Sequence, residues 1–455
     1  MSLRRELGLL HATMMGLGST ICAGIFVILS PAVEMAGPAV ILAFLLCGII
    51  NMATMLSYCE LGAAMPRMGG EYAYAKASFK GLPSFITGWY EWSSNIFYAT
   101  LMVLSSAYML SYILPIDKFL IIILLVIVFT AIDIKGIKET GIAQTLLTST
   151  LLAIILLFVG AGTTHGFRSN AFEPFMPKGP LSIIAAIAFI FETYLGVEAI
   201  AAAQAEIKKP EKTIPRAMIL CSLILIIVYC LVVYVTVGIV SPDVLSESLT
   251  PLNLVAEKTM GHAGVILLTI AGLIAALTSL NSAMIASSRV ACAMSRNGHF
   301  PKILRKVHDH YRTPYVAIAC GSIFIIFFSI VNNLEFVVYS ISFGFLIGFS
   351  IVNLSLIKLR RTKPHLHRPF KTPLYPLTPI IGIITSIGLL AFFNVKSLAF
   401  GILWGLSGLI MYSLKQKKPK IKRYAQPIDQ IKTVLRCCVD FTHKHWDNAP
   451  TTGLT

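Results

Sequence analysis

Long uncharged and mostly apolar runs recur along the whole chain. Four of them exceed the ~20 residues that span the hydrocarbon core of a bilayer: Gly37–Cys59, Trp92–Ile116, Thr140–Thr164 and Ala217–Val240. With a first run near the N-terminus, further apolar runs lie around 119–132, 181–204, 263–288, 315–334, 336–357, 375–395 and 397–414. Because lipid cannot hydrogen-bond the backbone, such runs predict helices. We therefore expect an all-α polytopic membrane protein with twelve transmembrane helices.

The distribution of charged residues adds a prediction of how the protein is oriented in the membrane. Charged residues make up 13% of the chain, against about 25% in soluble domains. With a cytoplasmic N-terminus and twelve alternating spans, five of the 37 Lys and Arg residues lie outside. These five are Lys118, Arg168, Lys178, Lys258 and Lys396. This positive-inside bias accounts for the net charge of +16 without a nucleic-acid partner. We expect a cell inner-membrane protein in contact with lipid, with both termini cytoplasmic.

Several chemistries find no support in the sequence. The histidine clusters at 308–310, 365–367 and 443–445 all fall in predicted loops. No phosphate-binding glycine loop, zinc motif or catalytic triad is evident, and the nine cysteines fall in spans or on the cytoplasmic side, which implies no disulfide framework. We expect no enzyme activity, no catalytic residues, no metal site and no cofactor.

The first span contains an unusual stretch, "GLGSTICAGIF", from Gly16 to Phe26. Gly16, Thr20 and Gly24 are four residues apart, which is the spacing of a small-residue packing face between helices. Alternatively, the stretch breaks the helix. A break exposes amides that favour a carboxylate and carbonyls that favour an ammonium, so it could hold both ends of an α-amino acid. The stretch alone leaves both interpretations open.

The sixth span favours the second interpretation, because "FETYLGVEAIAAA" places a glycine and two carboxylates at mid-span. Glu192 and Glu198 would lie some 240° apart on an unbroken helix, at about 100° per residue. A break at Leu195–Gly196 would allow both to face one point. The alternative is that each carboxylate is buried, protonated and bonded to neighbouring hydroxyls.

Interrupted helices five spans apart are typical of inverted-repeat transporters. We accordingly predict a transporter domain at 1–414 and a cytoplasmic tail at 415–455. Within the domain, repeat one covers about 8–164, repeat two about 181–357, and two extra helices about 375–414.

Other polar residues lie deep in predicted spans. Asn95, Asn281 and Ser282 could bond neighbouring helices or contact a ligand, and the first role is the more common. Glu60 and Glu91 lie near predicted cytoplasmic helix ends, where solvated or ion-paired roles are favoured.

The sequences of the predicted loops are more informative about the protein family than those of the predicted spans. Over roughly residues 8–415 the chain resembles the amino acid–polyamine–organocation (APC) superfamily of transporters. The resemblance rests on "GLGSTICAGIFV", "ELGAAMPRMGGEYAYA" (60–75), "IKGIKETGIAQTLLT" (134–148), "AEIKKPEKTIPRAMI" (205–219), "SRVACAMSRNGHFPK" (288–302), "YRTPYVAI" (311–318) and "RRTKPHLHRPFKTPLYP" (360–376). It implies a leucine-transporter-like fold of five-plus-five inverted repeats, with the substrate between broken helices one and six.

The resemblance also implies roles for particular residues. The substrate carboxylate would meet the amides around Ala23 and Gly24, and its ammonium the carbonyls near Thr20 and Leu195. "YLGVEA" (194–199) is most similar to the basic amino acid/polyamine antiporter branch. Asn95 falls where that branch places an asparagine that contacts the substrate side chain.

Three positions depart from the family pattern. Cys22 replaces a usual glycine, and Glu192 stands where the exchangers have an aromatic gate. Leu151 occupies the place of a membrane lysine in proton-coupled members. The missing lysine weakens the case for lysine-mediated proton coupling.

The sequence therefore predicts an amino acid exchanger for cationic amino acids or related amines. Its predicted substrate-binding residues are Thr20, Ala23, Gly24, Asn95, Glu192, Leu195 and Glu198. The main rival is proton-coupled uptake of neutral amino acids, with Glu192 or Glu198 as the proton carrier. A nutrient receptor that no longer transports is a third class. The oligomeric state stays open, with a homodimer as one option.

Overall fold

The computed structural model describes residues 7–22, 24–65, 70–79, 81–113, 115–136, 141–204, 207–331 and 333–416. The chain divides into two units, 1–410 and 411–455. The site described below belongs entirely to the first unit.

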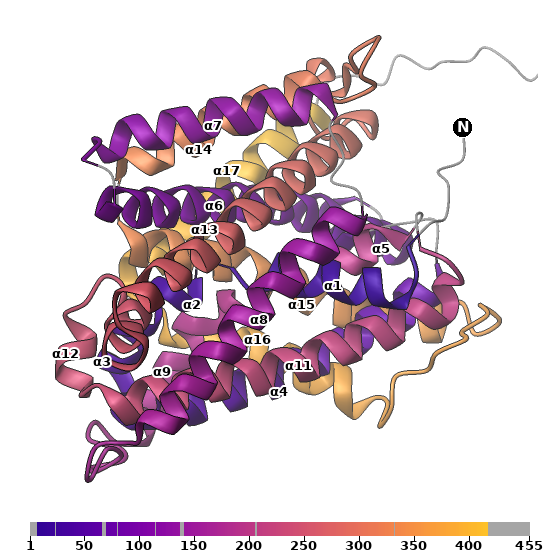
Figure 1. Cartoon of the computed structure of the whole chain (residues 1–455). Coiled ribbons are helices and arrows are strands. Elements are labelled where there is room, and N and C mark those ends of the chain that lie inside the picture. The colour runs from indigo at the N-terminus through magenta and orange to yellow at the C-terminus, as the bar shows by residue number, and fades with distance from the viewer. Residues whose placement is uncertain are drawn as a thin grey trace, which may run out of the picture. The chain divides into compact units, whose positions relative to one another are not determined.

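The described residues are almost entirely helical (Figure 1), and an isolated bridge between Leu7 and Ile207 is the sole β-type pairing among them. The helices up to residue 165 are α1 (Leu9–Thr20), α2 (Gly24–Val27), α3 (Leu29–Ala36), η1 (Gly37–Ala39), α4 (Val40–Ala64), α5 (Gly70–Ser78), α6 (Leu82–Ile113), α7 (Lys118–Lys135) and α8 (Gly141–His165). Those from residue 180 to 305 are α9 (Pro180–Ile190), η2 (Phe191–Tyr194), α10 (Ala199–Ala202), α11 (Pro210–Ile239), α12 (Pro242–Ser246), α13 (Pro251–Arg296) and η4 (Lys302–Arg305). The last are α14 (Tyr315–Val331), α15 (Leu334–Thr362), α16 (Leu377–Leu389), η5 (Leu390–Phe392) and α17 (Val395–Gln416).

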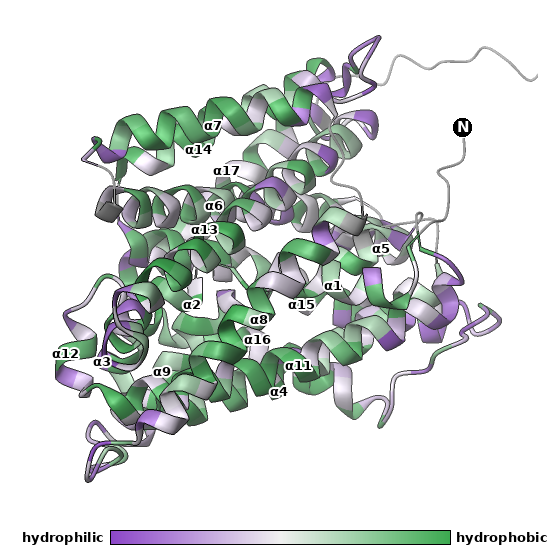
Figure 2. Cartoon of the chain, in the orientation of Figure 1, coloured by the Kyte–Doolittle hydropathy of each residue, from purple (hydrophilic) through white to green (hydrophobic). Residues whose placement is uncertain are grey.

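Apolar residues follow the helices, and polar residues gather in the loops that connect them (Figure 2). Within the described residues, eight helical stretches are long and apolar enough to cross a membrane. These observations indicate a multi-pass membrane protein. The number of twelve spans and the five-plus-five repeat layout stay predictions.

The outward face of α7 shows why such helices need lipid. Leu120, Leu124 and Ile127 are each 57–60% exposed, and their spacing of three to four residues places them on one side of the helix. Water would make this apolar stripe costly, whereas hydrocarbon would not. The opposite side of α7 packs on α6 and α14.

Some helices begin before the predicted apolar runs, and α13 differs most in extent. The predicted span at 263–288 is part of α13, which begins at Pro251 and ends at Arg296. Its backbone is interrupted at Gly261, where φ is 65° and ψ is −159°, a conformation that a residue without a Cβ adopts readily. Glu257 and Lys258 lie before this interruption, which explains why the hydrophobic pattern did not extend to the start of the helix.

The helices around α1 hold its end in the interior of the unit. α1 packs against α8, α11, α13 and α10, while α6 packs along α13 and α15. The far end of α1 is therefore buried on several sides. This is the place where the sequence predicts a broken helix.

Candidate functional site

The first break lies where the sequence predicts it. α1 ends at Thr20, and the helix resumes as α2 at Gly24. Ile21 still donates its N–H to the carbonyl of Leu17 at 2.7 Å. Cys22 is no longer helical, and its Sγ accepts the N–H of Gly24 at 3.2 Å. Ala23 lies outside the described residues. In this conformation the sulfur accepts a hydrogen bond from the Gly24 amide, which the family resemblance implies for a substrate carboxylate.

Hydroxyl groups from other helices meet the carbonyls freed at the end of α1. Tyr98 on α6 donates to the Ser19 carbonyl at 3.1 Å, and Tyr229 on α11 donates to the Thr20 carbonyl at 3.0 Å. Ser279 on α13 lies 3.4 Å from the carbonyls of both Gly18 and Ser19. These contacts satisfy backbone groups that a break leaves unpaired, so the break is a stable part of the fold.

The second break runs from η2 to α10. Leu195 is extended, with φ −81° and ψ 142°, and Gly196 has φ 127°. A Cβ at Gly196 would lie 2.5 Å from the Ser19 carbonyl oxygen, so this position requires glycine for both conformation and space. The two breaks are therefore in direct contact. The N–H of Gly196 is bonded to both carboxylate oxygens of Glu198, each at 2.9 Å.

A cavity of about 470 Å³ adjoins both breaks, a size typical of sites for small ligands. Ser19, Leu195, Gly196 and Glu198 contribute to its wall from the break regions. Further polar residues in the lining come from the beginning of α1 and from other elements: His11, Tyr58, Glu71, Tyr72, Glu91, Asn95, Tyr98, Gln144, Asn281, Ser282 and Arg289. Arg289 is exposed and His11 is half-buried, so the cavity reaches the surface beside the beginning of α1 and the last turns of α13.

The charged residues of the cavity are mainly acidic. Glu71, Glu91 and Glu198 line it, against one arginine, Arg289, and one histidine, His11. Glu91 accepts the N–H of Tyr72 at 2.8 Å, and it thereby caps the first turn of α5 from a neighbouring helix. Both oxygens of Glu71 lack a hydrogen-bond partner among the described residues, although this side chain is only 1% exposed.

The structure separates the predicted site residues into two groups. Asn95, Leu195 and Glu198 line the cavity. Asn95 also donates to the carbonyl of Glu91 at 2.7 Å, one turn back in the same helix. Thr20 and Gly24 are buried beside the break without lining the cavity.

Glu192 belongs to the second group, and its surroundings differ from those of Glu198. Its side chain is fully buried, and its oxygens lack a hydrogen-bond partner among the described residues. A Cβ on Gly24 would collide with this carboxylate and with the Cys22 sulfur. The structure therefore brings Glu192 to the first break itself, whereas Glu198 faces the cavity.

Several cavity residues were not among the predicted binding residues. Asn281 and Ser282 were noted as polar at depth, with contacts between helices as the favoured role, and both line the cavity. Glu71 lies within the family motif at 60–75, but nothing in one sequence says which way its side chain points. Apart from their polarity, nothing in the sequence indicates that Tyr58 and Gln144 line a cavity. All five come from elements distant in sequence from the two breaks.

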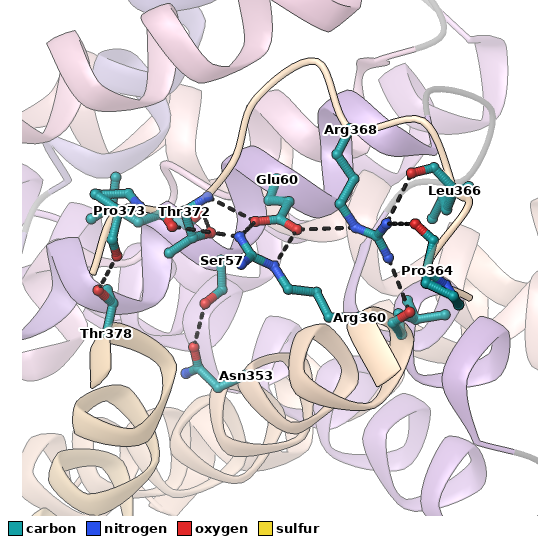
Figure 3. Close-up of polar contacts among 12 residues, drawn as sticks. Ser57, Glu60, Asn353, Arg360, Pro364, Leu366, Arg368, Thr372, Pro373 and Thr378 are labelled. Atoms are coloured by element: carbon teal, nitrogen blue, oxygen red, sulfur yellow. Dashed lines mark hydrogen bonds and ion pairs between the residues drawn. The ribbon is translucent and has the colours of Figure 1, made fainter. Parts of the chain in front are cut away.

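Another buried glutamate, Glu60, lies outside the cavity, near the end of α4. Glu60 accepts the Nε and Nη2 of Arg360 at 2.9 Å and 2.5 Å, forms an ion pair with Arg368 at 3.2 Å, and accepts the N–H of Thr372 at 2.7 Å. Figure 3 shows these groups converging on one carboxylate from α15 and the loop after it. Of the two roles expected for Glu60 and Glu91, solvated or ion-paired, Glu60 has the ion-paired one, whereas Glu91 is buried and accepts a backbone N–H.

Comparison with known proteins agrees with this architecture. A family model described as amino acid permease matches residues 7–412, which is most of the chain. The chain belongs to the amino acid permease family. The basic amino acid/polyamine branch within the superfamily stays a prediction.

Three relatives show how broad the resemblance is. The branched-chain amino acid permease BcaP of Bacillus subtilis (strain 168) is 26% identical, over 92% of this chain and 94% of the relative. The methylthioribose transporter of the same organism is 28% identical over the same shares of the two chains. Its serine/threonine exchanger SteT is 27% identical over 91% of this chain and 98% of the relative. The names of these relatives indicate transport rather than enzyme activity.

Proposed function

We propose that this protein transports amino acids across the membrane by alternating access, and that it exchanges cationic amino acids or related amines. One observation supports this above all others. A single cavity adjoins both helix breaks and contains three carboxylates, with Arg289 near its mouth. Such a cavity suits a ligand with at least one positive charge.

The break geometry supports an amino acid as that ligand. The C-terminal end of α1 is the negative end of the helix dipole, and Ser19 and Leu195 line the cavity beside it. An α-ammonium group would be favoured there. The Gly196 amide, now bonded to Glu198, would serve the α-carboxylate once Glu198 turned away.

Counterflow in proteoliposomes tests exchange directly. We expect labelled L-arginine or L-lysine to enter vesicles loaded with the same amino acid at least several-fold faster than empty vesicles. Equal rates would refute exchange. Absence of uptake for every amino acid, under any gradient, would refute the transport proposal itself.

A glycine substitution tests whether the second break forms the site. Gly196→Ala places a Cβ against the Ser19 carbonyl at a backbone angle that L-residues rarely adopt. We expect at least a tenfold loss of transport. Gly160→Ala on α8 is the matched control, because open space surrounds its Cβ. Normal transport by Gly196→Ala would contradict the broken-helix site.

Proton-coupled uptake of neutral amino acids is the second candidate. The bond between Glu198 and the Gly196 amide favours this candidate. A substrate carboxylate would have to replace the Glu198 carboxylate at this amide. Protonation of Glu198 would assist its release from the amide. The resemblance to BcaP is compatible with a neutral substrate. Leucine uptake driven by an imposed proton gradient, with no counter-substrate inside, would favour this candidate over exchange.

A further inference from the structure

Three carboxylates line the cavity, and one of them, Glu71, comes from α5, a short helix outside the apolar stretches. We propose that Glu71 on α5, together with the Tyr58 hydroxyl on α4, recognises the side-chain ammonium or guanidinium of a cationic substrate. This inference rests on the proposed transport function and names the residue that sets its preference for a cation.

The position of Glu71 indicates that a ligand is needed. A buried carboxylate without a hydrogen-bond partner is costly, and natural proteins pair such groups or neutralise them. Neither Glu71 nor the nearby Tyr58 hydroxyl makes a well-formed hydrogen bond with another described residue, although the two groups lie close enough for the hydroxyl to lower the pKa of Glu71. Both side chains are at most 1% exposed and line the cavity. An ammonium group entering the cavity would satisfy both, because its N–H groups can donate hydrogen bonds to a carboxylate and to a phenolic oxygen.

The neighbours of Glu71 hold it in place. Its Oε2 lies against Gly348 on α15, where an added Cβ would overlap with it. Tyr58 packs edge-on against Tyr74 of α5 and Phe349 of α15, with ring centroids 5.9 and 5.7 Å apart. Glu91 fixes the start of α5 through the Tyr72 amide. A carboxylate oriented in this way by packing loses little freedom when a ligand binds.

Electrostatics agrees with this geometry. Burial raises the pKa of Glu71 well above its ordinary value, repulsion from Glu91 and Glu198 raises it further, and the Tyr58 hydroxyl lowers it. The three carboxylates therefore disfavour each other's negative charge. A bound cation would relieve this repulsion.

The lining of the cavity suits an organic cation better than a metal ion. Within the described part of the chain, no group of three or more His, Cys, Asp or Glu side chains is arranged to hold a metal. The same cavity also continues to Ser19 and Gly196, where the α-amino and α-carboxyl groups are expected. One molecule with a terminal positive charge can therefore occupy both regions.

Lysine and norleucine form a matched pair of ligands for the test, since norleucine lacks the side-chain ammonium. Their binding is measured by calorimetry with the full chain in lipid nanodiscs. We expect the wild-type protein to bind L-lysine at least tenfold more tightly than L-norleucine. Glu71→Gln should weaken lysine binding at least tenfold and change norleucine binding less than twofold. Glu257→Gln is the control, because Glu257 is exposed and lies outside this cavity.

The outcomes separate the two proposals. Equal effects of Glu71→Gln on both ligands, or none on lysine, would overturn the role of Glu71 while leaving amino acid transport intact. A lysine preference that disappears when choline replaces sodium would assign Glu71 to a sodium ion instead. Failure of the wild-type protein to bind any amino acid would refute the proposed function itself. If Glu71→Gln does not fold, Glu71→Asp provides the test, because it should weaken lysine binding selectively.

Discussion

Glu60 and Glu71 are both buried glutamates in the same family motif, yet their surroundings are opposite. Glu60 is bonded to Arg360, Arg368 and the Thr372 amide (Figure 3). Glu71 has no hydrogen-bond partner among the described residues and lines a cavity. The protein itself supplies the hydrogen bonds and ion pairs of the Glu60 carboxylate, which is typical of a group that stabilises the fold. The Glu71 carboxylate is left unsatisfied where a ligand can reach it, which is the pattern of a binding group.

The largest expected effect is on Glu60. Glu60→Ala removes the anion between two arginines and leaves their charges without a partner at the end of α4. Breaking a buried ion pair in this way costs about 3–5 kcal/mol, and the partial exposure of Arg360, at 19%, places the cost at the lower end. We expect a clear drop in the thermal unfolding midpoint in detergent. An unchanged midpoint would mean that the ion pairs of Glu60 contribute no stability.

Arg360→Met should have a smaller effect. Arg368 and the Thr372 amide still contact the Glu60 carboxylate, so the charge keeps part of its compensation. We expect a destabilisation of about 1–3 kcal/mol, the range for leaving a buried polar group partly without hydrogen-bond partners. The same unfolding assay measures it. A loss as large as that of Glu60→Ala would show that Arg368 contributes nothing.

Glu71→Gln should stabilise the folded protein, in contrast to Glu60→Ala, and the size of this effect should depend on pH. Because the pKa of Glu71 is raised in the folded protein, the folded state retains a proton that the unfolded state loses as pH rises above its ordinary carboxyl value. This group therefore costs stability progressively as pH rises. The groups that face it are Tyr58, Glu91 and Glu198.

Unfolding midpoints of wild-type and Glu71→Gln between pH 5 and pH 8, without substrate, measure this effect. We expect the variant to gain stability relative to wild-type as pH rises. A difference that stays constant with pH would show that Glu71 does not titrate in this range. Added lysine should stabilise the wild-type protein more than the variant.

Tyr58→Phe should give the smallest effect of the series. The hydroxyl lowers the pKa of Glu71, so its removal should raise that pKa and move the pH dependence to higher pH. The aromatic contacts with Tyr74 and Phe349 would be retained, and we expect a stability change below about 1 kcal/mol. A large loss of stability would assign Tyr58 a packing role instead.

The sequence was informative about the helices and the two breaks. Uncharged runs predict membrane helices because lipid cannot satisfy the backbone, and helices occupy the predicted apolar ranges. The small residues before Gly24 and the glycine in "YLGVEA" also indicated where the helices end, because a backbone conformation such as that of Gly196 requires glycine. These features are local, so a single sequence contains them.

Only the tertiary structure decided which polar groups share a cavity. Glu192 and Glu198 lie six positions apart, yet one faces the first break and the other the cavity. Glu71 reaches the same cavity from a different helix, while Glu60 in the same motif is held by arginines three hundred positions away. Burial and pairing depend on elements distant in sequence, and no local pattern encodes them. The sequence therefore determined that the chain crosses a membrane with interrupted helices, and the packing of those helices decided which carboxylates line the cavity and which are paired with arginines.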